Sequence, residues 1–128
     1  MLDMKGNPKS GGIWAPCLSH DGEKFYLVFT DVKSWSQNPF KDTHNYITTA
    51  KNIEGPWSPP VYINSSGFDA SLFHDDDGRK WFLNMEWDYR ETGDDQFSGI
   101  LLQEYKKKNQ KLVGEIYKIF RGTDLKLV

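Results

Sequence analysis

The fold is indicated by the stretch Phe68-Asp69-Ala70-Ser71-Leu72-Phe73, which resembles Ile13-Trp14-Ala15-Pro16-Cys17-Leu18 at an offset of 55 residues. Each stretch leads into an Asp-Gly pair, Asp21-Gly22 in the first copy and Asp77-Gly78 in the second, where the turn is one residue longer. Another apolar run follows each pair, and apolar runs that flank an Asp-Gly pair are typical of a β-hairpin. The sequence therefore contains two copies of one β unit.

Each copy contains four candidate strands, and helical signals are nearly absent. The apolar segments are short, β-branched or aromatic, and Gly, Pro, Asn and Asp separate them. The predicted strands cover residues 12–18, 24–31, 44–50 and 60–63 in the first copy and 69–74, 79–87, 98–106 and 112–120 in the second. A period near 50 residues with four strands per unit is typical of a β-propeller blade. We therefore predict an all-β fold with two blades, at residues 12–63 and 68–120.

The length of the chain limits how much of a propeller it can form. Propellers close with about 4–8 blades, and 128 residues supply little more than two. We expect a piece truncated at both ends, or a chain that assembles with further blades. Residues 25–29 and 81–85 carry apolar side chains on both alternating faces, which predicts sheets covered on both sides. The alternative is a β-sandwich that contains two similar hairpins by coincidence.

The composition excludes several classes of protein. The net charge of −2 gives no electrostatic preference for nucleic acid or an anionic membrane, and no run approaches the roughly 20 apolar residues of a membrane span. Cys17 is the only cysteine, so we expect no internal disulfide and no cysteine metal cluster. Asp75-Asp76-Asp77 lacks the spacing of a calcium loop and is interpreted as a solvated turn. We expect no metal and no cofactor, and a cytoplasmic location because residues 1–8 lack a signal-peptide pattern.

Candidate ligand-binding residues lie at the start of the innermost strand of each blade, because that end lines the central channel of a propeller. At the offset of 55, the equivalent positions are Trp14 and Asp69. An indole stacks on the face of a sugar ring, while a carboxylate binds its hydroxyls or polarises the reacting group. The alternative is a turn role for Asp69, since Ser65-Ser66-Gly67 precedes it. Its place beside apolar Phe68 favours a functional role, because an unpaired carboxylate in a strand is costly.

Two segments then resemble a known family. They are Gly11-Gly12-Ile13-Trp14-Ala15-Pro16 and the segment Gly67-Phe68-Asp69-Ala70-Ser71-Leu72-Phe73-His74-Asp75-Asp76-Asp77-Gly78. Both look like segments of glycoside hydrolase family 43, and in particular of its bacterial β-xylosidases that also act on arabinofuranosides. Thr30-Asp31-Val32, His44-Asn45-Tyr46 and Gly122-Thr123-Asp124-Leu125-Lys126-Leu127 also fit, so the resemblance covers essentially the whole chain.

The resemblance implies a five-bladed propeller that hydrolyses with inversion and removes xylose or arabinose from the non-reducing ends of xylo-oligosaccharides. Family members use a general-base Asp, a general-acid Glu, and a second Asp that raises the pKa of the acid and orients it. Only the second Asp is matched here, as Asp69 in its Phe-Asp-Ala-Ser motif. Trp14, Ala15 and Phe68 are implied to line the subsite of the non-reducing sugar. Val128 stands where the family usually has Thr.

Because the motifs of the base and the acid are missing from the sequence, we expect the chain alone to be inactive. The expected partner is a xylo-oligosaccharide or arabinoside substrate, without nucleic acid or membrane, and the complete parent is expected to be a homo-oligomer. One alternative is a non-catalytic carbohydrate-binding propeller module. Another is a fructan-cleaving relative, which the absence of an Arg-Asp-Pro stretch disfavours.

Overall fold

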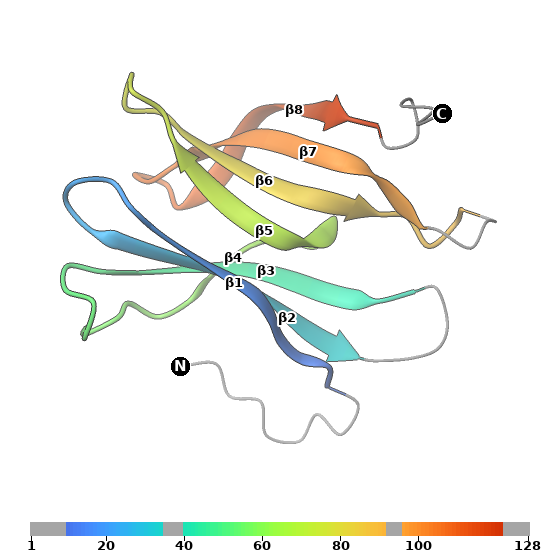
Figure 1. Ribbon diagram of the computed structural model, residues 1–128, viewed down its shortest axis with the longest axis horizontal. Coiled ribbons are helices and arrows are strands. Elements are labelled where there is room, and N and C mark those ends of the chain that lie inside the picture. The colour runs from blue at the N-terminus through green and yellow to red at the C-terminus, as the bar shows by residue number, and fades with distance from the viewer. Residues whose placement is uncertain (1–9, 35–39, 92–95, 122–128) are drawn as a thin grey trace, which may run out of the picture.

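The computed structural model describes residues 10–34, 40–91 and 96–121, which form two four-stranded antiparallel sheets (Figure 1). The first sheet has the order β1-β2-β3-β4, with bounds Gly12–His20, Phe25–Ser34, Asp42–Ala50 and Val61–Asn64. The second has the order β5-β6-β7-β8, with bounds Gly67–His74, Lys80–Trp87, Phe97–Lys106 and Lys111–Phe120. The all-β prediction is confirmed, and each of the eight predicted strands has its counterpart. The matched segment 122–127 lies outside the described residues.

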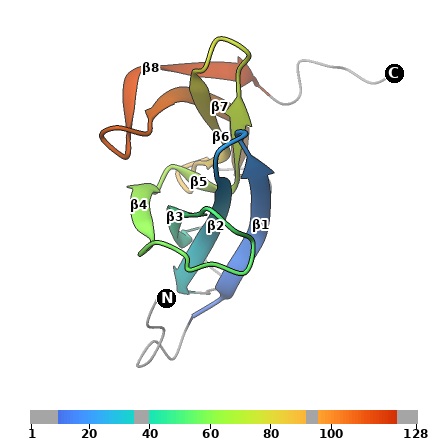
Figure 2. The same ribbon diagram turned by 90° about the vertical axis from the view of Figure 1, so that its left-hand side faces the viewer.

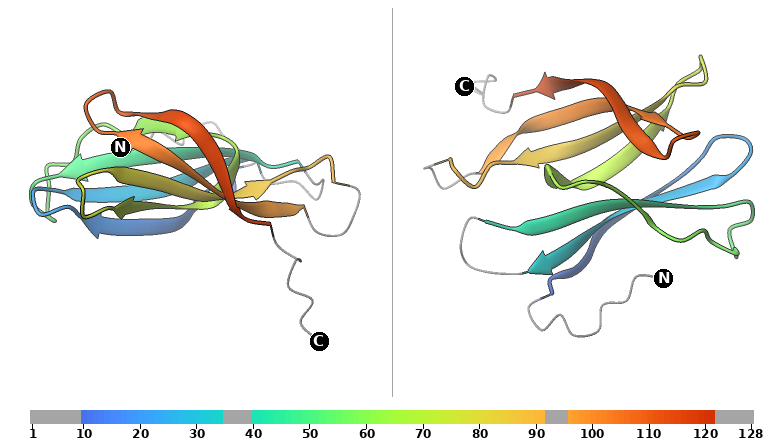
Figure 3. Two further views of the ribbon diagram at one scale, coloured as in Figure 1. Left: turned by 90° about the horizontal axis from the view of Figure 1, so that it is seen from above. Right: turned by 180° about the vertical axis from the view of Figure 1, so that it is seen from behind.

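The two sheets lie one over the other and share one core (Figure 2). The strand β5 packs against β1, β2 and β3 of the first sheet, and Figure 3 shows the same stacking from above and from behind. The core side chains that are buried between the sheets are Tyr26, Val28, Ile47, Ala70, Leu72, Phe82 and Tyr105. Among the described residues there is no helix, and therefore none that could cross a membrane.

The two faces of each sheet are not equally covered, although the consecutive residues 28–32 of β2 are all buried. Tyr26 and Val28 of β2 are buried against the second sheet, whereas Leu27 between them is half-buried. Leu18 on β1 is 51% exposed and Phe73 on β5 is 56% exposed. In residues 25–29 and 81–85, for which coverage of both faces was predicted, one alternating set of side chains is buried and the other is half-buried apart from the buried Phe29, so the prediction is met only in part.

The innermost strands of the two sheets are related by an offset of 54, not 55. The pairing of β1 with β2 is interrupted between Trp14 and Cys17, and that of β5 with β6 between Phe68 and Ser71. The counterpart of Trp14 is therefore Phe68, and Ala15 is the counterpart of Asp69. The equivalence of Trp14 and Asp69 is wrong by one residue, because similarity of side chains does not reveal the backbone position of a β-bulge.

Candidate functional site

A β-bulge at the same place in both innermost strands sets the shape of the candidate site. The bulges give Ala15 a φ of 41° and Asp69 a φ of 54°, which is the left-handed region. This conformation costs an L-residue about 1–2 kcal/mol, although Asp visits it more readily than Ala. Bulges re-aim a side chain out of the regular alternation and are common beside active sites. The same strained backbone conformation therefore re-aims the side chains at Ala15 and Asp69, the equivalent positions of the two innermost strands.

The bulge places the Asp69 side chain outside the core. Its neighbours Phe68 and Ala70 are buried, with 9% and 2% exposure, whereas Asp69 itself is exposed. No hydrogen bond or ion pair joins the Asp69 side chain to another described residue, so its carboxylate oxygens are open to a ligand or to solvent. A carboxylate presented in this way can accept hydrogen bonds from the hydroxyls of a sugar.

Aromatic rings form a wall around Phe68, the residue that precedes Asp69. The ring centroids of Trp14 and Phe68 lie 5.4 Å apart in an edge-to-face contact, and those of Phe68 and Trp87 also lie 5.4 Å apart. The Nζ of Lys41 lies 4.8 Å from the centroid of the Trp87 ring. The Trp14 indole is held by a hydrogen bond from its Nε1 to the carbonyl oxygen of Gly11, at 2.9 Å. The wall therefore joins the bulge of β1 to the end of β6.

A chain of buried and half-buried side-chain hydrogen bonds runs between the sheets close to the bulge. The hydroxyl of Thr30 donates to Asn45 Oδ1 at 2.6 Å, and Asn45 Nδ2 donates to Asn64 Oδ1 at 2.8 Å. Asn64 Nδ2 in turn donates to Asn84 Oδ1 at 3.1 Å, and Asn84 Nδ2 donates to Ser66 Oγ at 3.0 Å. A buried amide that loses its hydrogen-bond partner costs free energy. This chain of hydrogen bonds therefore favours one relative position of the two sheets.

The chain matches a known family over its whole length. The sequence model of the family "Glycosyl hydrolases family 43" matches residues 1–128. The chain belongs to glycosyl hydrolase family 43. A xylosidase/arabinosidase 43B of Humicola insolens is 68% identical over 127 residues, which cover 99% of this chain and 23% of that relative. A β-xylosidase of Bacillus subtilis (strain 168) is 58% identical over 126 residues, with coverages of 98% and 23%.

A solved structure gives the same result for the fold. The xylan β-1,4-xylosidase of Bacillus halodurans C-125 superimposes with a TM-score of 0.89 at 64% identity, covering 99% of this chain and 24% of that one. The two sheets are two blades of the five-bladed propeller of family 43, as the sequence predicts. The chain thus spans about a quarter of the length of the relatives that it matches.

The structure brings together all four residues that the resemblance to family 43 implicates. Trp14 and Ala15 lie at the bulge of β1, and Phe68 and Asp69 lie at the equivalent bulge of β5. Their individual roles remain predictions. Sequence reasoning missed Trp87, although it ends an apolar strand that was predicted correctly. Its contact with Phe68 follows from strand pairing, which residue types alone do not reveal.

An ionic cluster joins the two blades at the hairpin end, away from Asp69. Lys80 Nζ lies 2.8 Å from Asp21 Oδ2, and the side chains of both residues are less than one-tenth exposed. Tyr26 donates to the same carboxylate at 2.9 Å. Burial alone raises the pKa of Asp21, but Lys80, Tyr26 and two backbone N–H groups together hold this pKa well below its ordinary range. Burial and the nearby Lys80 also lower the pKa of His74.

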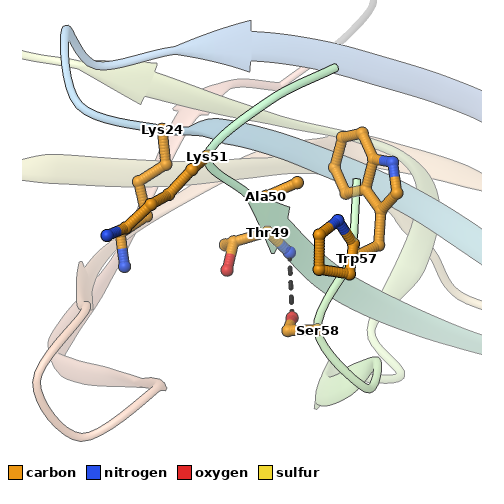
Figure 4. Close-up of a pocket in the computed structure, with 7 residues that line it drawn as sticks. Lys24, Thr49, Ala50, Lys51, Trp57 and Ser58 are labelled. Carbon is orange, nitrogen blue, oxygen red and sulfur yellow. Dashed lines mark hydrogen bonds between the residues drawn. The ribbon is translucent and has the colours of Figure 1, made fainter. Parts of the chain in front are cut away.

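The same hairpin end carries an open pocket of about 300 Å³ on the first blade (Figure 4). It is lined by Lys24, Thr49, Ala50, Lys51, Pro56, Trp57 and Ser58. The backbone N–H of Thr49 donates to Ser58 Oγ at 3.0 Å across its floor. No residue of the bulge region lines it, so this hollow is separate from the site around Asp69.

The acidic residues Asp75, Asp76 and Asp77 lie in the turn between β5 and β6. Asp77 accepts a hydrogen bond from the side chain of Arg79 at 2.6 Å, and Asp75 accepts one from the backbone N–H of Asp76 at 2.8 Å. Asp76 and Asp77 are exposed. Among the residues that the structure describes, no three His, Cys, Asp or Glu side chains are grouped to hold a metal ion.

Proposed function

We propose that this chain supplies two blades and one site carboxylate of a glycoside hydrolase that removes xylose or arabinose from the non-reducing ends of xylo-oligosaccharides, with inversion. The observation that carries the proposal is the exposed Asp69 on the bulge of an innermost strand, beside the aromatic wall of Trp14, Phe68 and Trp87. The names of the Humicola insolens and Bacillus subtilis relatives support the substrate class.

Asp69 would act by tuning and orienting the general acid. An inverting enzyme needs a protonated acid and an ionised base about 6.5–9.5 Å apart, with a water molecule beside the base. The base takes a proton from this water as it attacks the anomeric carbon, and the acid gives its proton to the departing oxygen. A third carboxylate near the acid disfavours a second negative charge, so the pKa of the acid rises and the proton is kept near neutral pH.

The aromatic wall would hold the sugar. The C–H faces of a pyranose or furanose ring pack on aromatic rings, while its hydroxyls bind polar groups at the edge. Trp14, Ala15 and Phe68 would line the subsite of the non-reducing sugar, in line with the family pattern, and Trp87 would extend it. The general base and general acid would come from other blades, so the chain alone is expected to show no turnover of an aryl β-xyloside.

The test uses a complete enzyme. This chain replaces the matched segment of the Bacillus subtilis β-xylosidase, to which it is 58% identical; we term the product the host chimera. The host chimera should hydrolyse an aryl β-xyloside, and Asp69→Asn should lower kcat by at least about 100-fold. Removing the negative charge lowers the pKa of the acid, so the alkaline limb of the pH–rate profile should move to lower pH.

The matched control is Asp76→Asn, which removes a carboxylate from the exposed turn at the other end of β5. This variant should keep the kcat and the pH profile of the host chimera. If Asp69→Asn keeps them as well, the assigned role of Asp69 is wrong.

A non-catalytic sugar-binding module is the second candidate, and the aromatic wall is the observation in its favour. It predicts a folded host chimera that binds xylotriose in a calorimeter but does not hydrolyse it. Turnover of xylotriose by the host chimera would exclude this candidate.

A further inference from the structure

The β-bulge interrupts the regular pairing of β5 with β6 at Asp69. The pairing of β5 with β6 passes from Phe68 opposite Met85 directly to Ser71 opposite Leu83. Asp69 therefore has no opposing residue in the register of β5 with β6. Its position must be held by the residues on either side of the bulge.

After the bulge, the strand is anchored by side chains. Ala70 and Leu72 are 2% and 5% exposed and belong to the core between the sheets. Before the bulge, Phe68 is held between the rings of Trp14 and Trp87.

Gly67 cannot be held in this way, because it has no side chain and no room for one. A Cβ atom built on Gly67 would lie 1.8 Å from the carbonyl oxygen of Met85. Besides its pairing with Glu86, the residue is held through its own carbonyl oxygen.

Two side chains of the first blade hold that carbonyl. Thr43 Oγ1 donates to the Gly67 oxygen at 3.1 Å, and Asn45 Nδ2 donates to it at 3.0 Å. Both donors lie on β3 and are buried, with 3% and 0% exposure. Asn45 is itself fixed by its bonds to Thr30 and Asn64. The carbonyl two residues before Asp69 is therefore clamped by the other blade.

We propose that Thr43, together with Asn45, is a positioning residue that sets the orientation of the Asp69 carboxylate by clamping the Gly67 carbonyl across the interface between the blades. This inference rests on the proposed function of Asp69. The side-chain hydrogen bond of Thr43 goes to the Gly67 carbonyl and not to the carboxylate, so Thr43 acts through the backbone. A buried hydroxyl-to-carbonyl bond is directional, and its loss lets the carbonyl turn toward another donor.

The test compares Thr43→Val with Thr48→Val in the host chimera. Thr48 lies on the same strand, is 7% exposed, and donates to a backbone carbonyl, that of Ser58, at 2.6 Å. Both substitutions replace a buried hydroxyl by a methyl group and should lower the melting temperature by similar amounts. Only Thr43→Val should lower kcat, by about 10–100-fold for a displacement approaching 1 Å, with KM little changed.

The pH profile separates positioning from general destabilisation. Thr43→Val should move the alkaline limb of the kcat profile to lower pH, because a displaced Asp69 raises the pKa of the acid less. Thr43→Ser keeps the hydroxyl and should restore both kcat and the limb. Equal kcat and pH profiles for Thr43→Val and Thr48→Val would overturn the inference, as would a Thr43→Ser variant as impaired as Thr43→Val.

Two further outcomes keep the inference separate from the proposed function. If Thr43→Val does not fold, Thr43→Cys takes its place, because a thiol of similar size is only a weak donor, and the same two readouts decide. An unsubstituted host chimera that folds but is inactive refutes the proposed function. An active host chimera with an unaffected Thr43 variant refutes only the positioning role.

Discussion

The substitution Gly67→Ala should disable the site through the backbone alone. The added Cβ would lie 1.8 Å from the Met85 carbonyl oxygen, 2.9 Å from its carbonyl carbon and 3.0 Å from the backbone nitrogen of Trp87. All three are backbone atoms, so no side chain can rotate away to make room.

The size of the effect follows from these distances. A carbon and a carbonyl oxygen approach to about 3.3 Å, so β5 and β6 must separate by about 1.5 Å, against a normal strand spacing of about 4.8 Å. This separation disrupts the pairing of Gly67 with Glu86 and the clamp from Thr43 and Asn45. A displacement of about 1 Å at a reacting group costs about 100-fold in rate. Losing two or three hydrogen bonds lowers the free energy of unfolding by about 2–3 kcal/mol.

The matched control is Gly78→Ala, in the turn at the other end of β5. Gly78 has a φ of +86°, and a Cβ built on it meets no atom within 4 Å. The control therefore adds backbone strain of about 1–2 kcal/mol without a clash and far from Asp69. Both variants are measured in the host chimera by kcat on an aryl β-xyloside and by thermal unfolding. A Gly67→Ala variant that keeps kcat within threefold of the host chimera would contradict this prediction, and so would a Gly78→Ala variant that loses as much kcat as Gly67→Ala.

Three other predictions concern the blade interface and the wall. Lys80→Met leaves the Asp21 carboxylate, which is only 6% exposed, without its cation. Chemical denaturation should therefore show that the free energy of unfolding falls by about 3–5 kcal/mol, and adding Asp21→Asn should recover most of it. A fall of less than about 1 kcal/mol would contradict this prediction. Because the folded pKa of Asp21 lies below its ordinary value, its contribution to stability is present above about pH 4 and is lost as the pH falls further. The stability advantage over Asp21→Asn should therefore shrink between about pH 4 and pH 2, and parallel stability curves would count against it. Trp14→Ala should weaken binding of xylose to the host chimera by about tenfold, as measured by competitive inhibition, whereas unchanged inhibition would exclude Trp14 from the subsite.

Much of the fold could be predicted from local patterns. The Asp-Gly pairs and the alternation of short apolar runs located all eight strands, because turn chemistry and side-chain period are local properties. The family motifs likewise led to Trp14, Ala15, Phe68 and Asp69, which the structure brings together. Placing Trp14 opposite Asp69 in the repeat failed by one residue, since a bulge inserts a residue without changing the composition of the strand.

The sequence by itself determined that this chain forms short strands in two similar units and carries the Phe-Asp-Ala-Ser motif that contains Asp69. Only the tertiary structure decided what surrounds that carboxylate. In the sequence, Thr43 and Asn45 are ordinary polar residues of a strand. In the structure, both donate hydrogen bonds to the carbonyl of Gly67, which lies more than 20 residues away in the chain. Trp87 likewise joins the wall through the pairing of β5 with β6. Local periodicity places a residue on a strand, but the partner that it meets depends on how distant strands pair and stack.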